Sequence, residues 1–166
     1  MTAETLNTLP RDEAEAQLRN CCAAETWVEG MLEGLPYRDK SALITQSRDL
    51  WPKLTEQDWL QAFSAHPKIG DIDSLRAKYA STRAMASGEQ AGARQAPEEI
   101  LQRLKACNDA YQEKFGFIFI VCATGKSAEE MLELLESRLT QTRAQEIATA
   151  AAEQAKITEL RLEKLL

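Results

Sequence analysis

Apolar residues recur at helical spacing along most of this 166-residue chain, and helix-start signals precede them. Pro10 is followed by acidic residues, which the positive end of a helix dipole favours. The apolar stripe after it stops at Gly34 and Pro36, and we expect one helix or two in that interval. The same reasoning, supported by capping signals at Thr55, Ser127 and Thr142, predicts further helices over residues 39–53, 55–63, 97–115, 127–139 and 142–165.

One apolar segment departs from this period. "FGFIFIVCA", residues 115–123, is a continuous run rich in β-branched and aromatic residues, which suits a buried strand or the turn into a buried helix. No other segment offers a partner strand, so we favour a buried non-helical connection near residues 116–122. The prediction is an all-α fold, a single compact bundle of seven or eight helices forming one domain over residues 1–166.

A second segment has no apolar stripe. "STRAMASGEQAGARQA", residues 81–96, contains two glycines and follows residues 73–80, which could form a short helix. Segments of this length without a core-facing period are more often functional or mobile than idle in a compact domain. Residues 81–96 are therefore a candidate location for site residues.

The amino-acid composition limits the ligands and surroundings that this protein can have. The net charge is 20 − 26 = −6, which argues against nucleic acid while leaving room for a small anionic ligand. No run of 18 apolar residues predicts a membrane span, and the N-terminus has no secretory pattern, so we expect a cytoplasmic protein. Four cysteines without C-x-x-C spacing and a single histidine predict free thiols and no metal site.

The single histidine, His66, is the first candidate for chemistry. Pro67 disfavours helical backbone at the residue before it, so His66 should end the helix through Phe63. The negative end of that helix would favour the imidazolium, and an imidazole near neutrality suits general acid–base catalysis. A histidine that only caps the last carbonyls fits the spacing equally well.

Two other charged residues are candidates. Glu89 lies between glycines in the unpatterned segment, where it could enter a pocket or stay solvated. Arg161 stands in "ITELRLEKLL" and could clamp a carboxylate or remain an exposed helical arginine. Arg138 and Arg143 are further cations available to an anionic ligand.

Four segments, in this order, carry a family resemblance. "FSAHPKIGD" is similar to an H-P-[RK]-I-G signature, and "GEQAG" to an E-Q-x-G signature. "NDAYQEKFGFIFIVCATGKSAEEMLELLESRL" resembles Y-x-x-x-F-G-F-x-F with the G-[RK]-S and M-L-x-x-L-x-x-R-L that follow it. "EQAKITELRLEKL" resembles a K-I-x-x-x-R-L ending. Together they resemble the 2-oxo-4-hydroxy-4-carboxy-5-ureidoimidazoline (OHCU) decarboxylase family.

The resemblance implies an all-helical enzyme without a cofactor, usually a homodimer, that acts on a small ureide. The implied reaction is the decarboxylation of OHCU to (S)-allantoin, the last step of urate breakdown to that product. It assigns the catalytic role to His66, with Glu89 as its acidic partner and Arg161 in contact with substrate.

The resemblance also implies residues that contact the substrate, and one of them departs from the family pattern. The family often has S-x-x-E-Q, but Ala86 holds the serine position here and Ser87 comes one residue later, so Ser87 is the candidate. The other implied contacts are Pro67, Gln90 and the backbone of Phe119, Ile120 and Val121.

Two rival functions stay open at this stage. One is a non-catalytic helical interaction module in which His66 is a cap, and the other is a hydrolase of a related ureide in which His66 activates water. The chain has no G-x-S-x-G, P-loop, G-x-G-x-x-G or H-E-x-x-H motif, which removes several other enzyme classes. Release of CO2 would separate the decarboxylase from both rivals.

Overall fold

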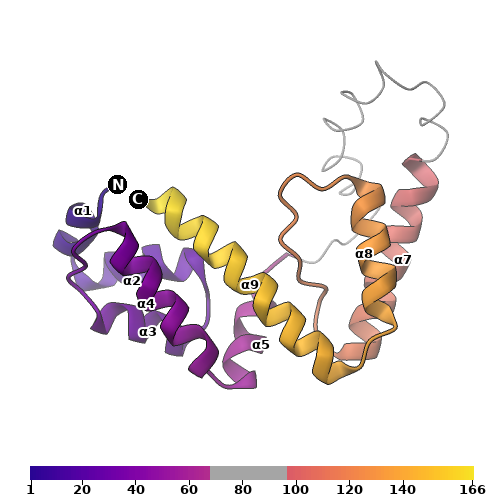
Figure 1. Cartoon of the computed structure of the whole chain (residues 1–166), viewed down its shortest axis with the longest axis horizontal. Helices are drawn as coiled ribbons and strands as arrows, with labels where there is room; N and C mark the ends of the chain where they lie inside the picture. The colour runs from indigo at the N-terminus through magenta and orange to yellow at the C-terminus, as the bar shows by residue number, and fades with distance from the viewer. Residues whose placement is uncertain (68–96) are drawn as a thin grey trace, which may run out of the picture. The chain divides into compact units, whose positions relative to one another are not determined.

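The structure is a computed structural model of the chain and describes residues 1–67 and 97–166 (Figure 1). Within these ranges it contains eight α-helices, one 3-10 helix and no strand, which confirms the predicted all-α class. The predicted short helix at residues 73–80 lies outside the described residues. The elements are α1 (Ala3–Thr8), α2 (Arg11–Cys21), α3 (Glu25–Glu33), α4 (Lys40–Leu50), η1 (Trp51–Lys53), α5 (Glu56–Ser64), α7 (Pro97–Phe115), α8 (Ala128–Leu139) and α9 (Arg143–Leu165).

The described residues divide between two compact units. The first unit comprises Met1–His66 and Ile147–Leu166, and the second is Pro67–Glu146. The long helix α9 begins in the second unit and continues in the first.

Local capping explains where several helices begin. Thr55 accepts a hydrogen bond from the Asp58 amide while the Asp58 carboxylate accepts one from the Thr55 amide, a complete capping box. Thr142 and Gln145 make the same reciprocal pair before α9. Ser127 accepts from the amide of Glu130 at the start of α8. These three predicted helix starts are confirmed.

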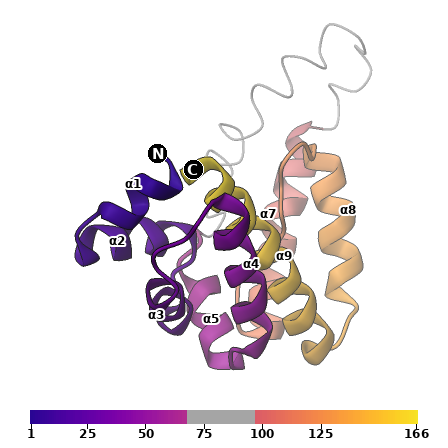
Figure 2. The same ribbon diagram turned by 60° about the vertical axis from the view of Figure 1, so that its left-hand side comes forward.

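The core of the first unit is built from the apolar stripes of its helices. The predicted stripe from Pro10 to Gly34 forms two helices, α2 and α3, and α4 lies beside the C-terminal part of α9 in both ribbon views (Figures 1 and 2). The indole of Trp51 donates to the Ala151 carbonyl of α9 at 2.9 Å, which satisfies a buried N–H. The fully buried large side chains of the first unit include Leu6, Leu18, Trp27, Met31, Leu43 and Phe63.

The second unit pairs α7 with α8, which lie side by side in both ribbon views (Figures 1 and 2). Residues 116–127 between them are non-helical, which confirms the predicted non-helical connection near residues 116–122, and Phe117, Phe119 and Ile120 within this segment are buried. Gly116 and Gly125 bracket it with φ of 84° and 75°, a conformation in which a Cβ is unfavourable. The segment leaves α7 and approaches α8 through these two glycines.

The first helix, α1, was not predicted because Leu6 is the only buried residue on it. Contacts with other parts of the chain stabilise α1 in place of an apolar stripe. The Asn7 amide donates to the Tyr37 carbonyl at 2.7 Å and accepts from the Tyr37 amide at 2.8 Å. A six-residue helix is marginal alone, so this side-chain clasp and the burial of Leu6 stabilise it.

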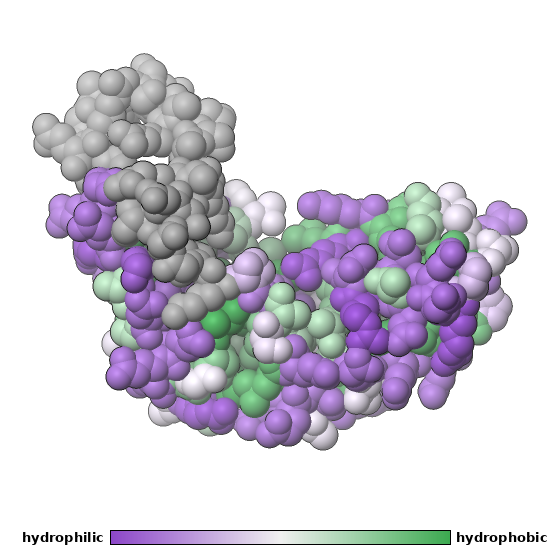
Figure 3. All heavy atoms as spheres, turned by 180° about the vertical axis from the view of Figure 1, so that it is seen from behind, coloured by the Kyte–Doolittle hydropathy of each residue, from purple (hydrophilic) through white to green (hydrophobic). Residues whose placement is uncertain are grey.

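The surface is largely polar. The face in Figure 3 is mostly hydrophilic with small hydrophobic patches, and the large apolar side chains exposed among the described residues are Met1 and Leu160. None of the helices over residues 1–67 and 97–166 has the length and apolarity needed to cross a membrane. The four cysteines are free, as predicted.

Candidate functional site

His66 lies just beyond the end of α5, as expected for a residue directly before a proline. Its backbone N–H donates to the Phe63 carbonyl at 3.1 Å, continuing the last turn after the cap residue Ala65. The imidazole is partly buried, and its Nε2 lies 2.5 Å from Oε1 of Gln154 on α9. The ring is therefore held by a side chain from another helix of the first unit.

Gln154 extends this contact into the core of the first unit. Its Nε2 donates to the Thr158 hydroxyl at 3.0 Å, one helical turn further along α9. Gln154 is 1% exposed and Thr158 is 3% exposed. Cys22 continues the chain of contacts, because Thr158 also hydrogen-bonds its thiol. We call His66, Gln154 and Thr158 the histidine network.

The environment keeps His66 neutral. Burial lowers its pKa below the usual 6.5, the positive charge of Arg161 lowers it further, and the hydrogen bond with Gln154 opposes both. The expected preference of the helix end for the imidazolium is therefore outweighed. At neutral pH the ring is in the form that can accept a proton or a hydrogen bond.

Arg161 occupies the same unit as His66. Its Nη1 lies 3.4 Å from the carbonyl of Cys21, the last residue of α2, where a cation complements the negative end of the helix. The residue as a whole is exposed. The positive charge of this exposed arginine thus acts on the imidazole of His66.

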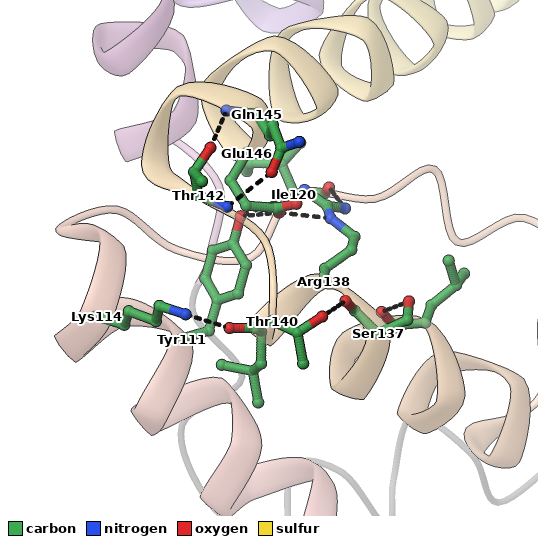
Figure 4. Close-up of polar contacts among 11 residues, drawn as sticks. Tyr111, Lys114, Ile120, Ser137, Arg138, Thr140, Thr142, Gln145 and Glu146 are labelled. Carbon is green, nitrogen blue, oxygen red and sulfur yellow. Dashed lines mark hydrogen bonds and ion pairs between the residues drawn. The ribbon is translucent and has the colours of Figure 1, made fainter.

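A charged cluster supports the non-helical segment of the second unit. The Arg138 guanidinium donates from Nη1 to the Ile120 carbonyl at 2.6 Å and from Nε to Glu146 Oε1 at 2.7 Å (Figure 4). The Tyr111 hydroxyl donates to the same Glu146 oxygen at 2.6 Å and accepts from Arg138 Nη2 at 3.3 Å. We call Tyr111, Arg138 and Glu146 the arginine cluster.

The arginine cluster is buried and fixes the backbone that precedes α8. Arg138 is 6% exposed, Glu146 1% and Tyr111 0%, and the guanidinium carbon lies 4.6 Å from the centre of the Phe119 ring. Among the described residues, Glu146 Oε2 is buried without a hydrogen-bond partner. Arg138 is therefore committed to the protein interior, and the prediction that it is available to an anionic ligand is wrong.

The second unit positions three of the predicted substrate contacts. Phe119 is 9% exposed, with its ring edge-on to Tyr111 at 5.4 Å, and Ile120 is 2% exposed. Val121 is partly buried, and all three are non-helical. Pro67 is exposed at the start of this unit. The structure thus supplies the irregular backbone that the sequence predicted, anchored through the Ile120 carbonyl.

A sequence model of the OHCU decarboxylase family matches residues 7–163, nearly the whole chain. The chain belongs to the OHCU decarboxylase family. His66, Arg161 and the segment around Ile120 all lie inside the matched range, as do both networks described above.

Similar proteins agree with this assignment. The chain is 38% identical over 152 residues to the uric acid degradation bifunctional protein TTL of Arabidopsis thaliana, covering 91% of this chain and 47% of that protein. It is 27% identical over 143 residues to the OHCU decarboxylase of Halalkalicoccus jeotgali, covering 86% and 76% respectively. The chain thus spans about half the length of the Arabidopsis protein.

Solved structures agree as well. A crystal structure of an OHCU decarboxylase in the presence of (S)-allantoin is similar with a TM-score of 0.71 and 37% identity, covering 89% of this chain and 94% of that one. A crystal structure of (S)-allantoin synthase shares the fold with a TM-score of 0.73 at 20% identity, covering 100% and 54%.

Three predicted residues of the OHCU decarboxylase site, Ser87, Glu89 and Gln90, lie outside the described residues and stay predictions. Gln154 and Thr158 were missed by the sequence analysis. Their signal is present, because two polar residues four apart occupy the buried stripe of α9 between Ala151 and Leu162. The neighbouring sequence does not show which side chain these two polar residues would hydrogen-bond.

Proposed function

We propose that this chain decarboxylates OHCU to (S)-allantoin in urate catabolism, acting as a carboxy-lyase. Membership of the OHCU decarboxylase family supports the reaction class. The observation that carries the proposal is the placement of the single histidine inside the matched range, partly buried, with a lowered pKa and with Arg161 nearby.

The reaction sets the demands on the site. One carbon–carbon bond breaks and its electron pair stays with the ring, so one carbon–hydrogen bond must form and one proton is consumed for each CO2 released. Hydrogen-bond donors and cations fixed in place lower the barrier by stabilising the charge as it develops. Formation of a single enantiomer requires that the proton reach only one face of the ring.

We assign roles to the candidate residues on this chemistry. Arg161 contacts the anionic substrate, because the residue is exposed while its Nη1 lies against the Cys21 carbonyl at the end of α2. His66 engages the hydroxyl group of the substrate. Glu89 acts as the acidic partner of His66, and its charge beside the substrate carboxylate favours the departure of CO2. The contacts from Pro67, Ser87, Gln90, Phe119, Ile120 and Val121 hold the ureide.

Domain organisation, oligomeric state, cellular location and cofactor use are also part of the proposed function. We propose that the two units form one catalytic domain, that the protein is a cytoplasmic homodimer and that it uses no cofactor or metal. The family match across both units supports the single domain. Light scattering during size-exclusion chromatography should give a mass of two chains, and a single-chain mass at micromolar concentration would remove the dimer from the proposal.

Circular dichroism during coupled urate oxidation tests the reaction. Urate oxidase and hydroxyisourate hydrolase generate the substrate, and the signal of optically active allantoin is followed with and without this protein. We expect a fast, enantioselective rise together with CO2 release. Racemic allantoin at the spontaneous rate would contradict the proposal, and a different ureide product would favour the hydrolase.

A matched pair of variants on α9 tests Arg161. Arg161→Gln and Lys164→Gln each remove one positive charge from an exposed position of the same helix. We expect Arg161→Gln to lower kcat/KM by about 10- to 100-fold, the usual size of a lost charge-assisted hydrogen bond, and Lys164→Gln to change it little. Equal effects would show that only the net charge matters.

A further inference from the structure

The buried stripe of α9 within the first unit contains two polar side chains that packing alone does not require. Gln154 and Thr158 are four residues apart, so they share one face of the helix with Ala150 and Leu162. Both are almost completely buried, and a buried amide without partners costs stability. Their hydrogen bonds therefore have to be satisfied inside the first unit.

The direction of these bonds fixes the position of a proton. The nitrogen of the Gln154 amide donates to Thr158 Oγ1 at 3.0 Å, so the amide oxygen faces His66 Nε2 at 2.5 Å. A carbonyl oxygen can only accept, and Nε2 must therefore carry the hydrogen. A neutral imidazole with hydrogen on Nε2 has its lone pair on Nδ1.

We propose that Gln154 and Thr158 are positioning residues that hold His66 as the neutral Nε2–H tautomer, so that Nδ1 accepts a hydrogen bond from the hydroxyl group of the substrate. The role of Nδ1 toward the substrate rests on the proposed function, whereas the tautomer of His66 rests only on the hydrogen bonds of the histidine network. In this arrangement His66 acts on the substrate as a hydrogen-bond acceptor at Nδ1 and does not donate the proton to carbon.

The choice of an amide in place of a carboxylate fits this role. A carboxylate at the Gln154 position would stabilise the imidazolium, whereas an amide orients the ring without supplying a negative charge. The charged group that acts on His66 from α9 is Arg161, which also disfavours the imidazolium. The Cys22 thiol, which Thr158 contacts, stays protonated because burial raises its pKa.

Nuclear magnetic resonance of the unmodified protein tests the tautomer directly, because His66 is the only histidine in the sequence. A long-range proton–nitrogen spectrum of 15N-labelled protein at pH 7.5 should show a protonated Nε2 and an unprotonated Nδ1. The Nε2 hydrogen should be protected from exchange with solvent. Protonation at Nδ1, or an Nε2 hydrogen that exchanges freely, would overturn the proposal whether or not the protein is a decarboxylase.

Gln154→Glu tests the role of the neutral amide. A carboxylate in contact with Nε2 should raise the pKa of His66 by about one to three pH units, measured on the same imidazole signals. It should also move the acidic limb of the kcat/KM profile upward by the same amount. An unchanged pKa in a folded variant, judged by its far-ultraviolet circular dichroism, would show that residue 154 does not contact the imidazole.

A pair of substitutions at Thr158 tests the second bond of the network. Thr158→Val preserves the shape and removes the hydroxyl, which frees the Gln154 amide to rotate and should abolish the exchange protection of the Nε2 hydrogen. We expect kcat/KM to fall by about 2- to 10-fold, the value of one hydrogen bond. Thr158→Ser retains the hydroxyl and should retain the protected signal. Protection that survives Thr158→Val would remove Thr158 from the proposal.

Discussion

The two units each contain a buried polar network, and the two networks differ in charge. The histidine network of the first unit joins an imidazole, an amide and a hydroxyl, all neutral at pH 7. The arginine cluster of the second unit pairs a guanidinium directly with a carboxylate, and a tyrosine hydroxyl hydrogen-bonds both groups. A neutral network orients a group whose protonation can change during a reaction, whereas an ionic one fixes a structure.

This difference follows from the cost of burying charge. A buried guanidinium requires a buried carboxylate, and removing either leaves an uncompensated charge. Arg138 accordingly binds Glu146 and uses a second nitrogen to hold the Ile120 carbonyl in the non-helical segment. The amide of Gln154 places no such demand on His66. We therefore expect changes to the arginine cluster to reduce stability and changes to the histidine network to alter the reaction.

Glu146→Gln should have the largest effect on stability. It leaves the buried Arg138 guanidinium without a counter-charge, which we expect to cost about 3–5 kcal/mol in the free energy of unfolding. Urea unfolding followed by circular dichroism measures it. A loss below about 1 kcal/mol, the range of surface ion pairs, would show that the cluster is not the ionic anchor of the second unit.

Tyr111→Phe should have a smaller effect, because it removes one hydrogen bond to Glu146 while the ion pair remains. The expected loss is about 1–3 kcal/mol, the cost of leaving a buried group without its partner. The same unfolding experiment applies. A loss as large as that of Glu146→Gln would mean that the hydroxyl, and not the opposite charges, holds the cluster together.

The pH dependence of turnover reports on the histidine network. The folded-state pKa of His66 is lowered from 6.5, so the neutral form persists as the pH falls to 6.5 and is lost below that value. We expect kcat/KM to stay level from pH 8 to 6.5 and then to decline with a slope approaching tenfold per pH unit. A midpoint at or above 6.5 would contradict the effect of burial and Arg161.

Glu136→Gln should have the smallest effect. Glu136 pairs with Arg103 at 2.5 Å in the second unit, but the two side chains are 42% and 54% exposed. Exposed pairs of this kind contribute about 0–1 kcal/mol. Because the substitution is chemically the same as Glu146→Gln, it is the matched control for burial in the arginine cluster.

The sequence predicted the features that depend on residues close together in the chain. The capping boxes at Thr55 and Thr142 involve residues three apart, and the non-helical segment after Phe115 was visible in its unbroken apolar run. The bond between His66 and Gln154 joins residues 88 apart, and the Arg48–Glu159 pair residues 111 apart. Only the folded chain reveals such partners, which is why Arg138 was taken for a free cation and Gln154 was overlooked.

Turnover and thermal unfolding of His66→Ala, measured on the same preparation, test whether the reaction depends on His66. We expect turnover to fall by at least about 100-fold and allantoin to form without handedness. The unfolding transition should remain, since the partly buried ring contributes less to the core than Phe63 beside it. Near-native, enantioselective turnover in His66→Ala would contradict the assignment of the reaction to His66.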